Sequence, residues 1–222
     1  MSKYLIHAIP QRLWYVNEYM IPAMTEQGID RNDIQILCDT NKRGCLEMFM
    51  LSCKMLPDKG NTWHLQDDIL ISSRFKEETE KPRNGIVCGF CSCYDHQNKP
   101  GEGNYKNKWF SFPCIRIPNK LAHGCANWFY NVVVPSQNEE WQRMIKCKKY
   151  DDSFFWIYIK RFHKTVKVTK LDPNIAEHVD YLIGGMVANY GRAENPISRY
   201  WYEPELTDKL FNDMMKRCLS TS

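Results

Sequence analysis

Residues 63–71, Trp63-His64-Leu65-Gln66-Asp67-Asp68-Ile69-Leu70-Ile71, form an apolar run that contains two adjacent carboxylates. The apolar residues predict a buried strand over 63–71, and the two acids come where such a strand should be ending. Carboxylates rarely enter a core without a partner. A strand tip with two of them is suited to hold a divalent cation and, through it, a phosphate. The alternative is a turn whose carboxylates cap the next helix, at Ser72 or Ser73.

Strand and helix patterns alternate around this run. Strand patterns cover 4–9, 34–38 and 85–91, and helical spacing covers 13–28, 45–55 and 73–80. This β-α-β-α-β-α-β order indicates a parallel sheet covered by helices. We therefore predict an α/β fold with a mostly parallel central sheet and helices on both faces. In such sheets ligands bind at the carboxyl ends of the strands, where Asp39, Asp67 and Asp68 are expected to lie.

The pattern loosens in the second half of the chain. The polar segment 96–108 predicts a mobile loop. Strands are expected over 109–118 and 166–168, and helices over 122–134, 139–148 and 175–187. Residues 154–159 fit either a buried helix or a buried strand. The length of 222 residues suits one domain better than two.

Composition limits the class of protein. A hydrophobic content of 43% excludes a largely disordered chain, and the net charge of +4 permits an anionic partner without requiring one. The N-terminal residues show no signal-peptide pattern, and no apolar run approaches membrane-spanning length. The ten cysteines are scattered through apolar segments, which predicts reduced, buried thiols in a cytoplasmic protein.

Several further acids and one histidine are candidates for chemistry. Asp39 follows a predicted strand, where it either bonds a base or a ribose hydroxyl or forms the first turn of the next helix. Asp151 and Asp152 precede an apolar run, as a general base or acceptor-binding carboxylate, or as a helix N-cap. His178 falls on a predicted helix start. It either makes a structural contact or completes the metal site at the strand tip.

Two other patterns in the sequence could form binding sites. Cys88, Cys91, Cys93 and His96 form a C-x2-C-x-C-x2-H pattern that could hold a structural zinc. Against this, two of the cysteines fall inside a strand pattern, where neighbouring side chains point apart. The chain has no P-loop, no GxGxxG fingerprint and no nucleophile elbow.

Basic residues gather late in the chain, with aromatic residues between them. The basic residues are Lys146, Lys148, Lys149, Lys160, Arg161, Lys164, Lys167 and Lys170, and the aromatic ones are Tyr150, Phe155, Trp156, Tyr158 and Phe162. This pattern predicts either a face that binds nucleic acid or a solvated face over a core.

Taken together, the segments resemble those of small glycosyltransferases of the GT-A type, particularly short versions encoded by bacteriophages. The resemblance covers roughly residues 3–190. It is carried by Asp39 after a strand, Leu65-Gln66-Asp67-Asp68, Asp151-Asp152-Ser153-Phe154-Phe155 and Pro173-Asn174-Ile175-Ala176-Glu177-His178. It implies one Rossmann-like GT-A domain over 1–222, in which 1–95 binds the nucleotide sugar and 96–222 supplies the acceptor side and the C-terminal helices.

The resemblance also implies a metal site. Asp67 and Asp68 would hold Mn²⁺ or Mg²⁺ against the diphosphate of a nucleotide sugar, with Asp68 as the direct ligand and Asp67 on the donor side. His178 would complete the metal shell. The motif here is Gln-Asp-Asp, whereas the family has Asp-any-Asp.

The remaining roles follow from the same resemblance. Asp152 or Asp151 would serve as the catalytic base or acceptor ligand. Asp39 would bind the nucleoside, and Arg12, which follows the first strand, would reach the base or the diphosphate.

The expected function is transfer of a sugar from a nucleotide-sugar donor, a UDP-sugar above others, to a hydroxyl acceptor. A hydroxymethylated pyrimidine in phage DNA is favoured by the late basic region over a protein or a glycan, and the enzyme would then work in the host cytoplasm. Two alternatives remain open. One is a non-catalytic nucleic-acid-binding protein with a structural zinc, and the other is a nucleotidyltransferase, which would release pyrophosphate.

Overall fold

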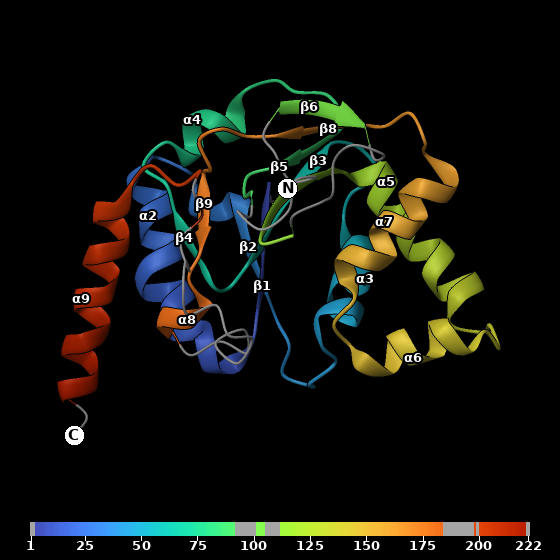
Figure 1. Cartoon of the computed structure of the whole chain (residues 1–222), viewed down its shortest axis with the longest axis horizontal. Helices are drawn as coiled ribbons and strands as arrows, with labels where there is room; N and C mark the ends of the chain where they lie inside the picture. Colours follow the sequence, from blue (N-terminus) through green and yellow to red (C-terminus); the bar gives the residue numbers. More distant parts are fainter. Residues whose placement is uncertain (1–2, 92–100, 105–111, 184–197, 199, 221–222) are drawn as a thin grey trace.

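A seven-stranded sheet runs through the centre of the computed structural model, in the order β2-β1-β3-β7-β5-β8-β6 (Figure 1). The structure describes residues 3–91, 101–104, 112–183, 198 and 200–220. The strands of this sheet are β1 (Tyr4–Ala8), β2 (Ile34–Cys38), β3 (Asn61–Gln66), β5 (Ile86–Cys88), β6 (Gly101–Asn104), β7 (Cys114–Pro118) and β8 (Lys167–Lys170). A second sheet pairs β4 (Ile69–Ile71) with β9 (Ala176–His178).

The strand directions confirm a mostly parallel sheet. Strand β1 runs parallel to β2 and β3, and β5 runs parallel to β8. Strand β7 is antiparallel to both β3 and β5, and β6 is antiparallel to β8. Strands β2, β1, β3, β5 and β8 therefore point one way, and β7 and β6 point the other. The alternation of strands and helices predicts the direction of the strands but not which strands lie side by side. A later strand can lie between two earlier ones, as β7 lies between β3 and β5.

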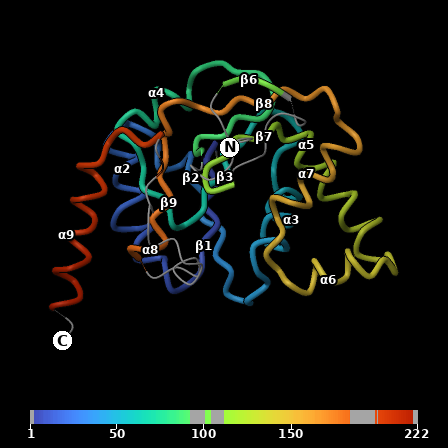
Figure 2. Tube along the Cα trace, in the orientation of Figure 1, coloured from blue at the N-terminus to red at the C-terminus, as the bar shows by residue number. Residues whose placement is uncertain are grey.

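Helices cover both faces of the sheet, as predicted (Figure 2). One face carries α1 (Leu13–Tyr15), η2 (Val16–Met20), α2 (Ile21–Glu26), α4 (Phe75–Glu80) and α9 (Pro204–Ser220). The other carries α3 (Cys45–Met55), α5 (Asn119–Trp128), η5 (Phe129–Val133), α6 (Glu139–Cys147) and α7 (Asp151–Phe162). Short turns η1 (Pro10–Arg12) and η3 (Arg31–Asp33) flank the first helices, and α8 (Asp180–Ile183) follows β9. None of the described helices is long and apolar enough to cross a bilayer.

Helix α3 shows how local sequence produces this packing. Gly44 precedes it with a φ of +88°, a conformation that glycine adopts without strain. Leu46, Phe49 and Cys53 then recur at helical spacing and are buried. The Phe49 ring packs 5.8 Å from that of Phe155 on α7. Residues 154–159, which fitted a helix or a strand, thus form part of a helix whose buried side faces α3.

Three predicted elements are wrong in detail. The strand over 63–71 breaks at Asp67-Asp68, and β4 leaves the main sheet. The helix predicted from residue 175 begins instead as strand β9, because the edge of β4 needs backbone partners and pairs Ile69 with His178. Part of the predicted loop over 96–108 is strand β6, which pairs with β8.

Strands from both halves of the chain form the same sheet. Strand β7, from the second half, pairs with β3 and β5 of the first half. The prediction of one domain over 1–222 stays a prediction. The division into a donor-binding half, 1–95, and an acceptor-binding half, 96–222, stays a prediction.

Gly89 lies where three segments meet beneath the carboxyl edge of the sheet. Its N–H donates to the Cys114 carbonyl at 2.8 Å, and its carbonyl accepts from the Ile175 N–H at 2.9 Å. A Cβ at this position would lie 2.6 Å from Cys114 Sγ and 2.7 Å from Ile175 Cγ1. These distances are too short for real atoms, so no side chain fits without movement of its neighbours.

We expect Gly89→Ala to lower the free energy of unfolding by about 1–3 kcal/mol, because overpacking a filled site forces neighbours apart. Urea unfolding followed by tryptophan fluorescence measures the loss. Cys114→Ala removes the nearest conflicting atom, so the double variant should lose less than the sum of the two single variants. Additive losses would contradict this explanation.

Candidate functional site

The acidic pair lies in the turn between β3 and β4, at the carboxyl edge of the main sheet. Asp67 and Asp68 are 5% and 7% exposed. The Asp68 carbonyl accepts a hydrogen bond from the Val179 N–H at 2.8 Å, which ties the turn to the end of β9. Tyr15 Oη donates to the Ile69 carbonyl at 3.0 Å and holds the turn from the helical side. Neither acid caps the next helix, whose N-cap is Arg74, so the alternative that these acids cap a helix is wrong.

Arg12 provides the positive charge that faces this pair. It ends the turn η1, directly after β1, and its Nη1 lies 2.8 Å from Asp67 Oδ1 and also contacts Asp68 Oδ2. The Ile9 N–H donates to the other Asp67 oxygen at 2.7 Å. Burial by itself would lower the pKa of Arg12, but the charges of Asp68 and Asp67 outweigh it and raise that pKa. Arg12, predicted to reach a nucleotide, is held by the acids in this structure.

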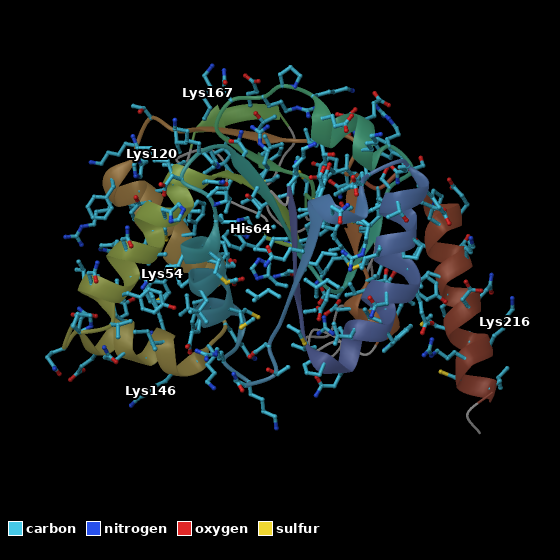
Figure 3. All side chains as sticks on the ribbon, turned by 180° about the vertical axis from the view of Figure 1, so that it is seen from behind. Lys54, His64, Lys120, Lys146, Lys167 and Lys216 are labelled. Carbon is cyan, nitrogen blue, oxygen red and sulfur yellow. The ribbon has the colours of Figure 1, made fainter. Side chains whose placement is uncertain are left out.

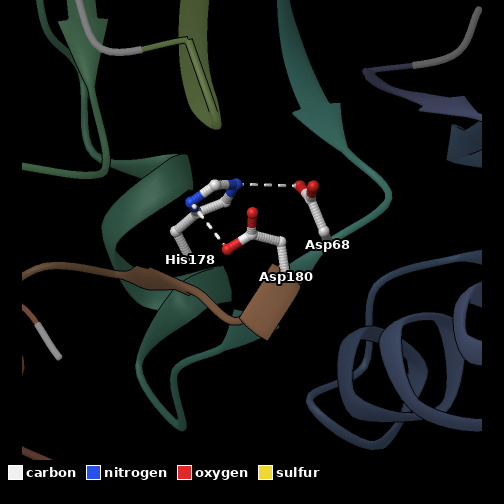
Figure 4. A group of neighbouring side chains, drawn as sticks. All are labelled: Asp68, His178 and Asp180. Carbon is white, nitrogen blue, oxygen red and sulfur yellow. Dashed lines mark ion pairs between the residues drawn. The ribbon is translucent and has the colours of Figure 1, made fainter. Parts of the chain in front are cut away.

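His178 reaches the same turn from β9, far along the chain. Its Nε2 lies 3.3 Å from Asp68 Oδ1, and its Nδ1 lies 3.6 Å from Asp180 Oδ1 (Figure 4). The prediction that His178 comes to the acidic pair is therefore matched by its position, although it sits on a strand and not on a helix. Asp180, 3% exposed, is a site residue that the sequence reasoning missed. The only signal for Asp180 in the sequence was that it follows His178 by two residues. In the helix that we predicted there, two residues at this spacing would point in different directions.

These three residues fit a divalent cation. One ligand atom from each of Asp68, His178 and Asp180 lies within 4.8 Å of the others, and no other such group occurs among the described residues. Asp68 Oδ1 is buried and accepts no hydrogen bond from the described residues, although His178 Nε2 is near. A buried carboxylate oxygen without a donor is costly unless a cation uses it. Two carboxylates and one imidazole are a common ligand set for such ions.

The two neighbouring acids have different electrostatic environments. Burial, reinforced by the charge of Asp68, raises the pKa of Asp67 to about 6 against the opposing effects of Arg12 and the Ile9 N–H. Burial also acts to raise the pKa of Asp68, but His178 and Arg12 outweigh it, so that pKa is lowered. Asp68 therefore stays ionised over the whole neutral range, as a metal ligand must.

Asp39 lies at the same edge, after β2. Its two carboxylate oxygens accept from the Arg43 and Gly44 N–H groups at 2.8 and 2.7 Å, which forms the turn into α3. Its charge and that of Asp67 both raise the pKa of Cys38, after the larger effect of burial. The turn-forming role is therefore observed. The nucleoside-binding role stays a prediction, which the position of Asp39 near Asp67 permits.

Asp151 and Asp152 begin α7, where Tyr150 is the N-cap residue. Neither acid is therefore the helix N-cap, which was the alternative to a catalytic role. Burial, with the charge of Asp152 second, raises the pKa of Asp151 to about 7, and burial also raises that of Asp152. Asp152 Oδ1 accepts from the Ser153 N–H at 2.6 Å.

Cys45 links α7 to the acidic turn. The residue begins α3 and is exposed. Loss of hydration around its thiol raises its pKa to about 12, and the charges of Asp151, Asp68 and Asp67 all add to the increase. Charges act this way only at short range inside a protein. Asp151, Asp68 and Asp67 are therefore all near enough to Cys45 for their charges to act on its thiol.

The cysteine pattern gains no support as a metal site. Cys88 and Cys91 are buried, and Cys91 Sγ lies 3.8 Å from the Leu171 carbonyl oxygen. Cys93 and His96 lie outside the described residues. The prediction of buried thiols holds for Cys53, Cys88, Cys91, Cys114 and Cys125, whereas Cys45, Cys147 and Cys218 are exposed.

The late basic and aromatic region is mainly a solvated face over a core. Phe155 and Tyr158 point into the core from α7, and Lys170 is 1% exposed on β8. Lys167 lies at the top and Lys146 at the bottom of the molecule in Figure 3, so the basic residues do not form one patch. A smaller group lies beside the site: Lys148 Nζ donates to the Lys42 carbonyl, and the Leu46 N–H of α3 donates to the Lys148 carbonyl.

Neither a family model nor a curated protein sequence matches the chain. Three similar solved structures illustrate what the fold comparison finds. Galactosyltransferase LgtC, in complex with donor and acceptor sugar analogues, is 12% identical with a TM-score of 0.44, over 95% of each chain. A Drosophila beta-1,4-galactosyltransferase 7 mutant, in complex with manganese, UDP-Gal and xylobiose, is 10% identical with a TM-score of 0.46, over 92% of this chain and 79% of that one.

The third is a putative glucose-1-phosphate thymidylyltransferase from Bacillus anthracis in complex with a sucrose. It is 11% identical with a TM-score of 0.40, over 88% of this chain and 97% of that one. At TM-scores below 0.5 these likenesses assign no family. The function must be inferred from the site itself.

The raised pKa of Asp151 predicts how stability depends on pH. The folded state holds the Asp151 proton more tightly than the unfolded chain, whose pKa is near 3.8. The free energy of unfolding should therefore fall as pH rises from about 4 to about 7 and then level off. Asp151→Asn removes this titration and should be the more stable protein at pH 8 by about 1–3 kcal/mol, with little difference at pH 4. Urea unfolding at both pH values tests this, and an Asp151→Asn variant less stable at pH 8 would contradict it.

Proposed function

We propose that the protein is a metal-dependent glycosyltransferase that moves a sugar from a nucleotide-sugar donor to a hydroxyl acceptor. The observation that carries the proposal is the group Asp68, His178 and Asp180 at the carboxyl edge of the sheet, in contact with Arg12 through Asp68. In open α/β sheets this edge is where ligands bind. The GT-A-type resemblance of the sequence implies that the donor diphosphate binds at the same turn.

Asp68, His178 and Asp180 would hold the ion. When bound, Mn²⁺ or Mg²⁺ would stabilise the negative charge that develops on the departing nucleoside diphosphate. The imidazole nitrogen favours Mn²⁺, because Mg²⁺ prefers oxygen ligands alone. Asp180 extends the ligand set that the sequence predicted, and its buried carboxylate also lies 3.6 Å from His178 Nδ1, where it would fix the orientation of the ring.

The donor would occupy the edge between the strand ends. Asp39 has lone pairs left after its two backbone hydrogen bonds, so it can accept from a ribose hydroxyl as well. The exposed Lys42 and Lys148 lie beside the same turn and supply positive charge for an anionic ligand. We propose a UDP-sugar as the donor.

The acceptor would be activated from the α7 side. In an inverting transfer a carboxylate must accept the proton of the attacking hydroxyl. Asp151, with a pKa of about 7, is suited to this task, and Asp152 follows it in the same helical turn. We propose that one of these two acids is the catalytic base.

We expect Asp68→Asn to lower metal-dependent turnover of a UDP-sugar by roughly 100-fold or more, because it removes a charged ligand. The assay counts nucleoside diphosphate released in the presence of Mn²⁺, and donors are first chosen by their effect on the melting temperature. Asp33→Asn, which removes an acid paired with Lys3 at the amino end of β2, is the matched control and should be fully active. Undiminished turnover in Asp68→Asn, or release of pyrophosphate instead, would refute the proposal.

The finer proposal concerns the acceptor: a hydroxymethylated pyrimidine in DNA, as in a phage enzyme working in the host cytoplasm. We expect sugar transfer to DNA containing that base and none to unmodified DNA, with binding that weakens steeply with salt. Equal transfer to a free sugar or a glycan at any salt concentration would remove DNA as the acceptor and leave the glycosyltransferase proposal intact.

Asp152→Asn should slow sugar transfer far more than it weakens donor binding.

A further inference from the structure

We propose that Arg12 is the built-in counter-cation of the acidic site and that its charge sets the affinity of the site for a divalent cation. This inference rests on the proposed metal site at Asp68, His178 and Asp180. It assigns Arg12 a role different from direct contact with the nucleotide, which the sequence suggested.

Arg12 neutralises the charge of the two carboxylates, but its hydrogen-bond geometry is not ideal. An arginine usually grips one carboxylate with two parallel N–H groups. Here a single nitrogen, Nη1, serves both Asp67 and Asp68, while the buried Nε has no hydrogen-bond partner among the described residues. Arg12 is itself 8% exposed. Such a costly arrangement is maintained because two buried carboxylates without a cation would cost more.

Arg12 and a bound ion would share Asp68 without competing for the same atom. Arg12 contacts Oδ2, whereas Oδ1 faces His178 and accepts no hydrogen bond from the described residues. The ion and the guanidinium would therefore lie on opposite sides of one carboxylate. At that separation two positive charges repel each other, and the repulsion lowers the affinity of the free site for the ion.

The charges in the site explain what would overcome this repulsion. Asp67, Asp68 and Asp180 carry three negative charges, and Arg12 carries one positive charge. With Arg12 and a bound divalent ion, the net charge of the site is zero. A further anion is then attracted by the two positive groups together, Arg12 and the ion. A diphosphate is such an anion. Arg12 thus makes the ion bind weakly alone and more tightly together with a nucleoside diphosphate.

The test is the dissociation constant for Mn²⁺ alone, measured by isothermal titration calorimetry without nucleotide. We expect Arg12→Met to bind Mn²⁺ roughly tenfold or more tightly than the wild type, because a nearby positive charge is gone. Arg12→Lys keeps the charge and should bind as the wild type does. Arg74→Met, which breaks an ion pair with Glu78 away from the site, is the matched control and should also leave the affinity unchanged.

Arg12→Met could fail to fold without metal, because three acids then face one another. In that case the proposal requires that Mn²⁺ restores the folded circular dichroism spectrum, while NaCl at equal ionic strength does not. Failure of Mn²⁺ to restore folding would overturn the proposal, as would a folded Arg12→Met protein that binds Mn²⁺ no more tightly than the wild type.

The same titration separates this inference from the proposed function. A wild-type protein that binds Mn²⁺ neither alone nor with UDP refutes the metal-dependent function. A wild-type protein that binds Mn²⁺, with an Arg12→Met variant of equal or lower affinity, refutes only the role of Arg12.

Discussion

The burial of two adjacent carboxylates at the end of β3 is the constraint on which the rest of the site depends. Removing a charge from water costs several kcal/mol unless partners replace the lost hydration. The replacements come from two separate parts of the chain. Arg12 and the Ile9 N–H come from the segment after β1, and His178 comes from β9. The acidic turn therefore requires η1 to follow β1 at once and requires β9 to return beside β4.

The same partners give two neighbouring aspartates different properties. Asp67 is held by Arg12 and a backbone N–H, yet burial and its neighbour raise its pKa to about 6. Asp68 lies between Arg12 and His178, and the pKa of its carboxyl is lowered. Environments that push two carboxylates apart in pKa give them different roles. Asp67 thus supports the turn and Arg12, and Asp68 keeps its negative charge, as the proposed role of metal ligand requires.

Much of this arrangement was predictable from short segments of sequence. The helix over 45–55 and the strand over 34–38 match the structure because their burial pattern and their boundaries are local. The acids after β2 and β3 fall at one edge because parallel strands end on the same side. The errors share one cause, which is pairing between distant segments. The local pattern of 63–71 predicts one strand, but its last residues form β4, which pairs with β9 in a second sheet. The local pattern of 175–178 predicts a helix, but these residues pair with β4 instead.

Local patterns were enough to predict the α/β class, the helices on both faces, and the position of Asp39, Asp67 and Asp68 at the carboxyl edge, because periodicity and strand direction are local properties. Three features appeared only in the folded chain: β7 lies between β3 and β5, Asp180 lies beside Asp68 and His178, and Arg12 faces the acids. These are contacts between residues far apart in the chain. Such contacts stabilise the protein only after the sheet has brought the segments together, so local sequence patterns do not predict them.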